Sequence, residues 1–534
     1  MIAFHDVSFR YGASWIVEHL DLEVVDGELL VVVGPTGSGK STVLKMIDAL
    51  VPHFSGGELL GDVVVAGRSI RQALPTDLAG MVGYVGQDPS ASFVTDRVEE
   101  EVAYAMENLG IAPAVMRRRV EDALDLMSLH DLRDRRLSTL SGGQRQRVAI
   151  AAVLAASPEV LVLDEPTSAL DPGAAEEVLS SLTRLVHDVG MTVVLAEHRL
   201  ERVLPFADRV VLLDGAGGAS VGEPGAVMAH SSLAPPLVEL GRVAGWSPAP
   251  VTVRAARRMA GPLVAALGDA RPPVHERDDG AVVAVTDGLC ASFGDHLALD
   301  GIDLEVRSGT ITAVMGRNGS GKSTLLGSLA GVVVPSCGGA LVDGTAPARL
   351  TPADRIRTVG FVPQDASLLL YGQRVDEECT TADAEHGLDP GTTARSVAAI
   401  AGPLDPARHP RDLSEGQRLA LALGIVLAPA PRLVLLDEPT RGLDYEAKRS
   451  LVAVLAGLRD QGVAVVLATH DVELVAQVAD HAVVLAQGEV IAAGEAREVV
   501  CHTPAFAPQV AKVLSPLSWL TVAEVARALA GEVA

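Results

Sequence analysis

The hexapeptide GSGKST occurs twice in the chain, at Gly37–Thr42 and again at Gly319–Thr324. Each copy follows a short apolar run, Leu29–Val33 or Ile311–Met315, that is typical of a buried strand, and each leads into a helical pattern. The full pattern is G-x-x-x-x-G-K-[S/T], whose glycines turn backbone N–H groups towards one anion while the helix presents its positive end to it. The repetition therefore constrains the chain to an α/β fold with two phosphate-binding loops.

Both loops belong to a longer internal repeat, because other short motifs occur in the same order around each of them. The matching pairs are Tyr11-Gly12 and Phe293-Gly294, Gln87-Asp88 and Gln364-Asp365, Leu140–Gln144 and Leu413–Gln417, Leu163–Thr167 and Leu436–Thr440, Ala169–Asp171 and Gly442–Asp444, and His198 and His470. The offset between partners falls from 282 residues at the first pair to 272 at the last. One domain has therefore been duplicated, with short deletions in its loops.

The repeat also predicts the domain boundaries. Similar tails follow the two copies, since Pro236-x-Val238 is matched by Pro508-x-Val510. The segment between the first tail and the second copy is rich in Gly, Pro and charge, as a linker would be. We expect a first domain, its tail, a linker, a second domain and its tail at residues 1–232, 233–260, 261–280, 281–505 and 506–534.

The composition of the chain indicates what its core is made of, which partners are unfavourable and in which compartment the chain is expected. It is 48% hydrophobic but only 3% aromatic, so its core must be made of Ala, Val and Leu, which suits parallel strands packed against helices. A net charge of −25 argues against nucleic acid as a partner, because the phosphate backbone needs a basic surface. The apolar run Leu419–Pro431 is too short to cross a membrane, and no signal peptide is evident. We expect a cytoplasmic chain.

The four cysteines, Cys290, Cys337, Cys379 and Cys501, are scattered and form no CxxC pair. This spacing predicts neither a zinc site nor a disulfide framework, and it fits a reducing compartment best.

The two loops carry the groups that a nucleoside triphosphate and its Mg²⁺ require. Lys40 and Lys322 can reach the β and γ phosphates, and the hydroxyls of Ser41 and Ser323 can bind Mg²⁺. The predicted nucleotide-binding residues of the loops are Gly34, Thr36, Gly37, Ser38, Gly39, Lys40, Ser41 and Thr42, and Gly316, Asn318, Gly319, Ser320, Gly321, Lys322, Ser323 and Thr324.

Two apolar strands end in paired acids, at Asp164-Glu165 and at Asp437-Glu438. A phosphate-bound Mg²⁺ needs a carboxylate at such a strand end, which Asp164 and Asp437 can provide. Glu165 and Glu438 would then lie beside the γ-phosphate and polarise the attacking water. These residues predict an ATPase with two competent sites that use ATP and Mg²⁺.

Taken together, these motifs resemble those of the ABC-type ATPases, and the resemblance covers nearly all of both halves. Its most specific element is Leu140-Ser-Gly-Gly-Gln144, placed before an Ala-rich helix and the Asp-Glu strand. The resemblance implies an α/β fold of two tandem P-loop nucleotide-binding domains, each with a mixed or parallel sheet core, an antiparallel β region and a helical subdomain. It also implies that each ATP lies between the loop of one domain and the signature of the other.

Further site residues follow from the resemblance. Adenine would stack on an aromatic residue, a glutamine would sense Mg²⁺ and the attacking water, a histidine would contact the γ-phosphate, and an aspartate would link the two sites. In that order, these residues are Tyr11 and Phe293, Gln87 and Gln364, His198 and His470, and Asp171 and Asp444. The signature residues are Ser141, Gly142, Gly143 and Gln144, and Ser414, Gly416 and Gln417.

The second signature departs from the pattern, because Glu415 stands where the first has glycine. A carboxylate that pointed towards the γ-phosphate would be unfavourable. The site formed by Lys40 and Ser414 could therefore bind or hydrolyse ATP differently from the other.

An acidic triplet follows each of the two glutamines, at Glu99–Glu101 and at Asp376–Glu378. Acids in the first turn of a helix can simply complement the helix dipole. The stretch after Gln87 also resembles the energy-coupling (ECF-type) ATPases of importers for vitamins, vitamin precursors or transition-metal ions. That resemblance implies grooves near Asp96–Glu101 and Arg374–Glu378 that receive arginines of a membrane coupling subunit by charge-assisted hydrogen bonds.

The ECF resemblance further implies a small membrane subunit that binds the substrate, and a peripheral position at the cytoplasmic face of the membrane. Two alternatives stay open: the ATPase of another ABC transporter type, and a soluble twin ABC ATPase acting on ribosomes or nucleic acid. The second usually carries a basic helical linker or zinc modules, and neither is evident here.

Overall fold

The computed structural model describes residues 1–168, 170–273, 280–503 and 506–531. It divides into two compact units, Met1–Ala255 and Ala256–Ala534, and each is described by itself. Part of the predicted linker, at 274–279, and the end of the second predicted tail lie outside the described residues.

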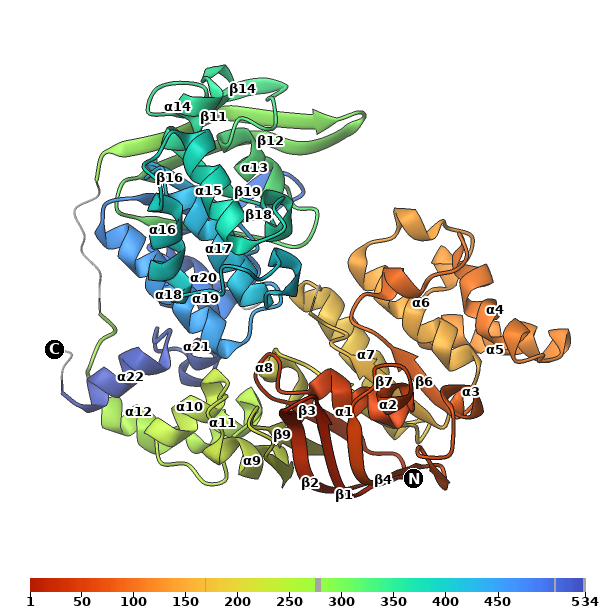
Figure 1. Cartoon of the computed structure of the whole chain (residues 1–534). Coiled ribbons are helices and arrows are strands. Elements are labelled where there is room, and N and C mark those ends of the chain that lie inside the picture. The colour runs from red at the N-terminus through yellow and green to blue at the C-terminus, as the bar shows by residue number, and fades with distance from the viewer. Residues whose placement is uncertain (169, 274–279, 504–505, 532–534) are drawn as a thin grey trace. The chain divides into compact units, whose positions relative to one another are not determined.

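The first unit is built on a six-stranded sheet in the order β10-β9-β3-β8-β7-β6. Figure 1 labels β3, β6, β7 and β9 of this sheet. Its strands are parallel except β10, which is antiparallel to β9. β3, β7 and β8 are buried at every residue, as expected for apolar strands covered on both faces. The strands are β3 Leu29–Val33, β6 Val82–Val85, β7 Val160–Asp164, β8 Thr192–Ala196, β9 Arg209–Leu213 and β10 Ala219–Gly222.

An antiparallel sheet in the order β2-β1-β4-β5 shares the core of the first unit. Phe4 and Phe9 of β1 are buried in the same cluster as Val32 of β3. Burial of such aromatic side chains joins the two sheets into one domain. The strands are β1 Ile2–Tyr11, β2 Ser14–Val24, β4 Glu58–Val65 and β5 Arg68–Ser69.

Helices α4, α5 and α6 pack on one another and form the helical subdomain, drawn in orange in Figure 1. α6 lies close to β6 at Gly83, where a Cβ atom would stand only 2.1 Å from Cγ1 of Val153. The helices of this unit are α1 Lys40–Ile47, α2 Leu50–His53, α3 Pro75–Leu78, α4 Val98–Asn108, α5 Pro113–Leu126, α6 Gly142–Ala155, α7 Pro172–His187, α8 Leu200–Val203, α9 Pro224–His230 and α10 Pro236–Val243. The next helix, α11 Val253–Met259, begins in the first unit and ends in the second.

The second unit repeats this architecture. Its six-stranded sheet has the order β15-β16-β17-β13-β18-β19, parallel except for β19, and its antiparallel sheet has the order β12-β11-β14. The strands are β11 Val282–Phe293, β12 His296–Arg307, β13 Ile311–Met315, β14 Cys337–Val342, β15 Val359–Val362, β16 Leu433–Asp437, β17 Ala464–Ala468, β18 His481–Ala486 and β19 Glu489–Glu495.

Helices α15, α16 and α17 form the helical subdomain of the second unit. Gly360 of β15 is equivalent to Gly83: a Cβ atom there would stand 2.6 Å from Cγ1 of Val426, so α17 lies close to β15 at this residue. The helices are α12 Gly261–Leu267, α13 Lys322–Leu329, α14 Pro352–Thr358, α15 Val375–His386, α16 Thr392–Ala401, α17 Glu415–Leu427, α18 Tyr445–Asp460, α19 Val472–Val478, α20 Ala496–His502, α21 Gln509–Leu514 and α22 Val522–Leu529.

These elements confirm the predicted fold class of two tandem α/β domains, each with a mixed sheet, an antiparallel region and a helical subdomain. Over the described ranges, no helix is both long and apolar enough to span a bilayer.

Residues that follow the first repeat are built into the second unit. Residues 261–267, the start of the predicted linker, form α12, which packs against α22. Nε of Arg257 donates a hydrogen bond of 2.6 Å to the carbonyl oxygen of Lys512. Beside them, Arg497 and the buried Glu524 form an ion pair of 2.6 Å. Helical parts of both tails therefore lie together in one unit.

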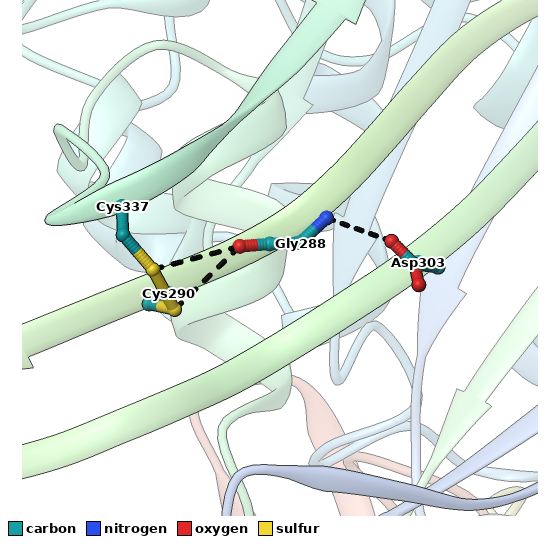
Figure 2. Close-up of a disulfide and its surroundings, with 4 residues drawn as sticks. All are labelled: Gly288, Cys290, Asp303 and Cys337. Carbon is teal, nitrogen blue, oxygen red and sulfur yellow. Dashed lines mark hydrogen bonds between the residues drawn. A yellow bond between two sulfur atoms is a disulfide. The ribbon is translucent and has the colours of Figure 1, made fainter.

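The expectation that the cysteines form no disulfide is wrong for Cys290 and Cys337, which are bonded to each other (Figure 2). The two residues lie directly opposite each other on the antiparallel strands β11 and β14, with their Cα atoms 4.9 Å apart. That distance is within the range a disulfide needs. In the same view the backbone oxygen of Gly288 lies 3.5 Å from the Cys290 sulfur and 3.6 Å from the Cys337 sulfur. The two cysteines are 47 residues apart in the sequence and are brought together by the pairing of β11 with β14, which the local sequence does not reveal.

Candidate nucleotide-binding and hydrolysis sites

The phosphate loop of the first unit joins β3 to α1. Gly39, the residue before α1, has φ 96°, a backbone conformation that side chains with a Cβ rarely adopt. Lys40 is buried, and its Nζ donates hydrogen bonds of 2.9 Å to the carbonyl oxygens of Gly34 and Pro35. The lysine is thus folded across its own loop, where phosphate oxygens would be its stronger partners.

The second loop, between β13 and α13, has the same geometry. Gly321 has φ 103°, and Nζ of Lys322 donates to the carbonyl oxygen of Gly316 at 2.9 Å and to that of Arg317 at 3.2 Å. Both predicted loops therefore have the backbone conformation that the sequence pattern requires.

The residues present fit a magnesium ion. Asp164 and Asp437 are buried at the ends of β7 and β16, and in each one carboxylate oxygen, Oδ1, lacks a hydrogen-bond partner. Burial raises the pKa of both carboxyl groups, while hydrogen bonds from the Ser41 and Ser323 hydroxyls act in the opposite direction. A hydroxyl and a carboxylate beside a phosphate loop are the protein ligands that nucleotide-bound Mg²⁺ uses.

No cluster of three acidic, histidine or cysteine ligands exists in the portions of the chain that the structure describes. Nucleotide-bound Mg²⁺ takes most of its ligands from phosphate and water, so one hydroxyl and one carboxylate from the protein fit it.

Glu165, the predicted catalytic acid of the first unit, meets two other predicted site residues. Its Oε1 lies 2.5 Å from Nε2 of His198, and its Oε2 accepts a hydrogen bond of 3.0 Å from Nε2 of Gln87. Glu165 also has a positive φ of 52°. Such a backbone is costly for a residue with a side chain and is found where surrounding contacts hold it, often at active sites. Three chain segments thus converge on one carboxylate.

Glu438 occupies the same place in the second unit. It has φ 48°, its Oε2 lies 2.7 Å from Nδ1 of His470, and its Oε1 lies 3.6 Å from Nζ of Lys322. Burial alone would raise the pKa of Glu438, but the hydrogen bond and charge of His470 and the charge of Lys322 outweigh it and lower that pKa. The acid is therefore held as a carboxylate, the form that can accept a proton from water.

The two predicted adenine-stacking residues end equivalent strands. Tyr11 is the last residue of β1, and Phe293 is the last residue of β11. Their side chains are 36% and 55% exposed, which leaves aromatic surface available to a base. The Tyr11 hydroxyl is held by a 3.1 Å hydrogen bond to Oγ of Ser55.

The signature residues build the start of a helix in both units. The hydroxyl of Ser141 accepts from the backbone N–H of Gln144 at 3.3 Å, and the Gln144 side chain accepts from the Ser141 N–H at 2.9 Å. Ser414 and Gln417 make the same reciprocal pair. This capping box leaves the positive end of the helix dipole available to an anion.

Close packing explains why both signatures have a glycine at the same position, Gly143 in the first and Gly416 in the second. A Cβ atom on Gly143 would lie 2.8 Å from Cβ of Ala174. A Cβ atom on Gly416 would lie 2.9 Å from Cβ of Ala447. Glu415 forms an ion pair with Arg418, one turn further along α17, and its side chain is half exposed.

Asp171 and Asp444 are helix caps in the structure. Asp171 accepts from the N–H of Ala174 at 2.8 Å, and Asp444 accepts from the N–H of Ala447 at 2.9 Å. The contact of these aspartates and of the signatures with the opposite site stays a prediction.

Sequence reasoning missed three polar residues around the first site. The Tyr84 hydroxyl donates a 3.3 Å hydrogen bond to Oδ2 of Asp164, and burial, followed by the charge of Asp164, raises the Tyr84 pKa. Burial raises the pKa of Asp48, next to α1, to about 7. Glu197 is fully buried and accepts a 3.2 Å hydrogen bond from the N–H of Thr167. Comparison of the two repeats could have found them, because the second copy has Phe361, Ala330 and Thr469 at these places.

The acidic triplets after the glutamines are only partly available to a partner. Glu101 is buried, and its Oε2 accepts hydrogen bonds from the backbone N–H groups of Val94 and Thr95 at 3.0 and 2.8 Å. Glu378 is likewise buried and accepts from the N–H of Gly372 at 2.5 Å. Glu101 and Glu378 therefore anchor the loops before their helices and are not exposed to a partner's arginine.

Comparison with known proteins places this geometry in a family. The model of the family described as ABC transporter matches residues 17–168 and 299–441. A Streptomyces avermitilis protein named as an ABC transporter ATP-binding protein is 54% identical over 99% of this chain and 100% of its own length. A Methanosarcina mazei protein of the same name is 31% identical over 93% of this chain and 90% of its own length.

Among solved structures, an archaeal ABCE1 bound with Pelota to the ribosome is similar with a TM-score of 0.64, at 23% identity, over 92% of this chain and 79% of that one. At this level of identity, the similarity concerns the fold alone.

The arrangement can cleave a phosphoanhydride. Ser41 with Asp164, and Ser323 with Asp437, would hold a Mg²⁺ ion, which would supply positive charge beside the phosphates. The loop N–H groups and Lys40 or Lys322 would hold the phosphates, while Glu165 or Glu438 would accept a hydrogen bond from water and take its proton. With these sites and these matches, the chain belongs to the ABC transporter family as a twin-domain ATP-binding protein that hydrolyses ATP with Mg²⁺.

Proposed function

We propose that this ATPase is the energy-coupling subunit of an ECF-type importer for a vitamin, a vitamin precursor or a transition-metal ion. In this proposal it lies at the cytoplasmic face of the membrane and binds a membrane coupling subunit and a small substrate-binding membrane subunit. The observation that carries the proposal is the connection, in the first unit, between Glu165 and an exposed surface just after Gln87.

In the first unit this connection starts at the Gln87–Glu165 hydrogen bond. The chain then runs through an exposed loop to Val94, whose side chain is 61% exposed. Glu101 of α4 accepts hydrogen bonds from the backbone N–H groups at the end of this loop. The loop is therefore attached to Gln87 at one end and to α4 at the other, and a shift of Gln87 would move it. Asp96 and Glu100 are exposed beside Val94. An apolar side chain flanked by acids suits a partner helix that carries an arginine.

The corresponding surface of the second unit has different side chains. Leu368 and Tyr371 are 60% and 84% exposed, and Glu377 is exposed beyond them. Asp376 is engaged with Arg374 at 2.6 Å. Exposed apolar side chains next to a negative charge occur in both units, and their differences support binding of two non-identical helices of one partner.

Charge reversal at the exposed acids tests the surface. We expect Asp96→Lys with Glu100→Lys, and separately Glu377→Lys, to lower retention of the membrane subunit at least about tenfold. Loss of one charge-assisted hydrogen bond and its replacement by repulsion exceeds about 1.4 kcal/mol. Retention is measured by pull-down from detergent-solubilised membranes.

A matched control changes an exposed acid on another helix, Asp122→Lys in α5, which should leave retention unchanged. Nucleotide binding by the variants shows that they fold. Equal retention by all variants would contradict the proposed surface.

Purification of the chain from membranes, with mass spectrometry of the bound proteins, tests the assignment to ECF importers. A coupling subunit together with a small substrate-binding membrane protein supports it. Co-purification of membrane subunits of another ABC type would instead support the first alternative, a different ABC transporter. Co-purification of ribosomal proteins would support the second, a soluble twin ABC ATPase.

A further inference from the structure

The two nucleotide sites differ in one hydroxyl group beside the aspartate expected to bind Mg²⁺. Tyr84 in β6 pairs with Val162 in β7, and Phe361 in β15 pairs with Leu435 in β16. Each is the third residue of its strand, and each partner lies two residues before the strand-end aspartate. Tyr84 and Phe361 are therefore structurally equivalent, and only Tyr84 carries a hydroxyl.

That hydroxyl is directed at the metal-binding carboxylate. It donates to Oδ2 of Asp164 at 3.3 Å, while Oδ1 of Asp164 is buried and has no hydrogen-bond partner. One oxygen of the carboxylate is thus held by a protein donor, and the other is left for a ligand. A phenyl ring at the position of Phe361 cannot hold Asp437 in this way.

A second polar residue reinforces the difference. Asp48 follows α1 in the first unit and its charge acts on the Tyr84 hydroxyl, whereas Ala330 follows α13 in the second unit. The trio Asp48, Tyr84 and Asp164 is therefore replaced by one acid and two apolar side chains. Nothing in the shared motifs requires this difference, because both units retain the loop lysine, the loop serine and the strand-end aspartate.

We propose that Tyr84 is a positioning residue for Asp164 and that it makes the first unit's nucleotide site bind Mg²⁺ more tightly than the second unit's site. A hydrogen bond from the protein to a metal-binding side chain restricts its orientation before the metal arrives, and losing such a partner typically costs about 10- to 100-fold in metal affinity. The inference rests on the ATPase sites alone and is independent of the transport partner.

The test uses the full chain with one site disabled. In a Lys322→Ala background only the first unit's loop keeps its lysine, and nucleotide binding is titrated against Mg²⁺. We expect Tyr84→Phe to raise the Mg²⁺ concentration for half-maximal binding about tenfold. Binding of nucleotide in excess EDTA should be unchanged, because the loop and the aromatic ring are retained.

The reciprocal variant is the matched control. In a Lys40→Ala background, Phe361→Tyr should lower the Mg²⁺ requirement of the second unit's site. Phenylalanine already stands at this position of the second unit, so Tyr84→Phe is compatible with the fold. An unchanged Mg²⁺ requirement in Tyr84→Phe, or an equal loss of binding with and without Mg²⁺, would overturn the proposal.

Discussion

The double variant Glu165→Gln with Glu438→Gln should hydrolyse ATP at least about 100-fold more slowly than the natural chain, which corresponds to about 2.7 kcal/mol in the activation free energy. Glutamine has nearly the shape of glutamate but cannot take a proton from water. In the natural chain each acid is paired with a histidine, His198 or His470. Phosphate release from ATP measures the rate.

The single variants show how many sites work. If the sites act independently, each single change should leave about half of the rate, and if they act together each should remove most of it. Glu176→Gln, an exposed change on α7, serves as the matched control. ATP binding should persist in all variants, because the loop lysines are untouched. A double variant with the natural rate would refute the role of both acids.

Asp48→Ala should make the first unit more stable than the natural protein at pH 8, and the difference should grow with pH between about 4 and 7. Burial raises the pKa of Asp48 from 3.8 to about 7. Between these values the folded unit keeps a proton that the unfolded chain has released, so the free energy of unfolding falls as pH rises. The fall is about 1.4 kcal/mol per pH unit, or about 4 kcal/mol over the whole window.

Alanine removes this cost, and Ala330 stands at the equivalent place in the second unit. Hydrogen exchange of the β7 amides, compared between variant and natural protein at the same pH, measures the unfolding free energy of the first unit. From pH 5 to pH 7 the difference should widen by about 2 kcal/mol. EDTA keeps Mg²⁺ from the neighbouring Asp164 during the measurement. A difference that is the same at both pH values would contradict the shifted pKa.

The acids after the glutamines show where sequence reasoning reached its limit. The pattern predicted a helix at the first triplet, and the structure places both triplets in the first turns of helices, α4 and α15. Glu101 and Glu378 accept hydrogen bonds from backbone N–H groups six or seven residues earlier in the chain. The path of the preceding loop therefore decides which acids are exposed to solvent, and the sequence pattern does not show that path. The surface proposed for a partner is therefore smaller than the sequence predicted.

The sequence by itself determined the fold class, the duplication and the two ATP sites. Their motifs are contiguous runs in which backbone conformation and ligand are encoded together, as in the loops that end at Lys40 and Lys322. The tertiary structure alone decided the Cys290–Cys337 bond and the packing of α12 on α22. It alone also decided the contact of Tyr84 with Asp164. These contacts join residues far apart in the chain, and strand register and helix packing, which local periodicity does not specify, bring them together.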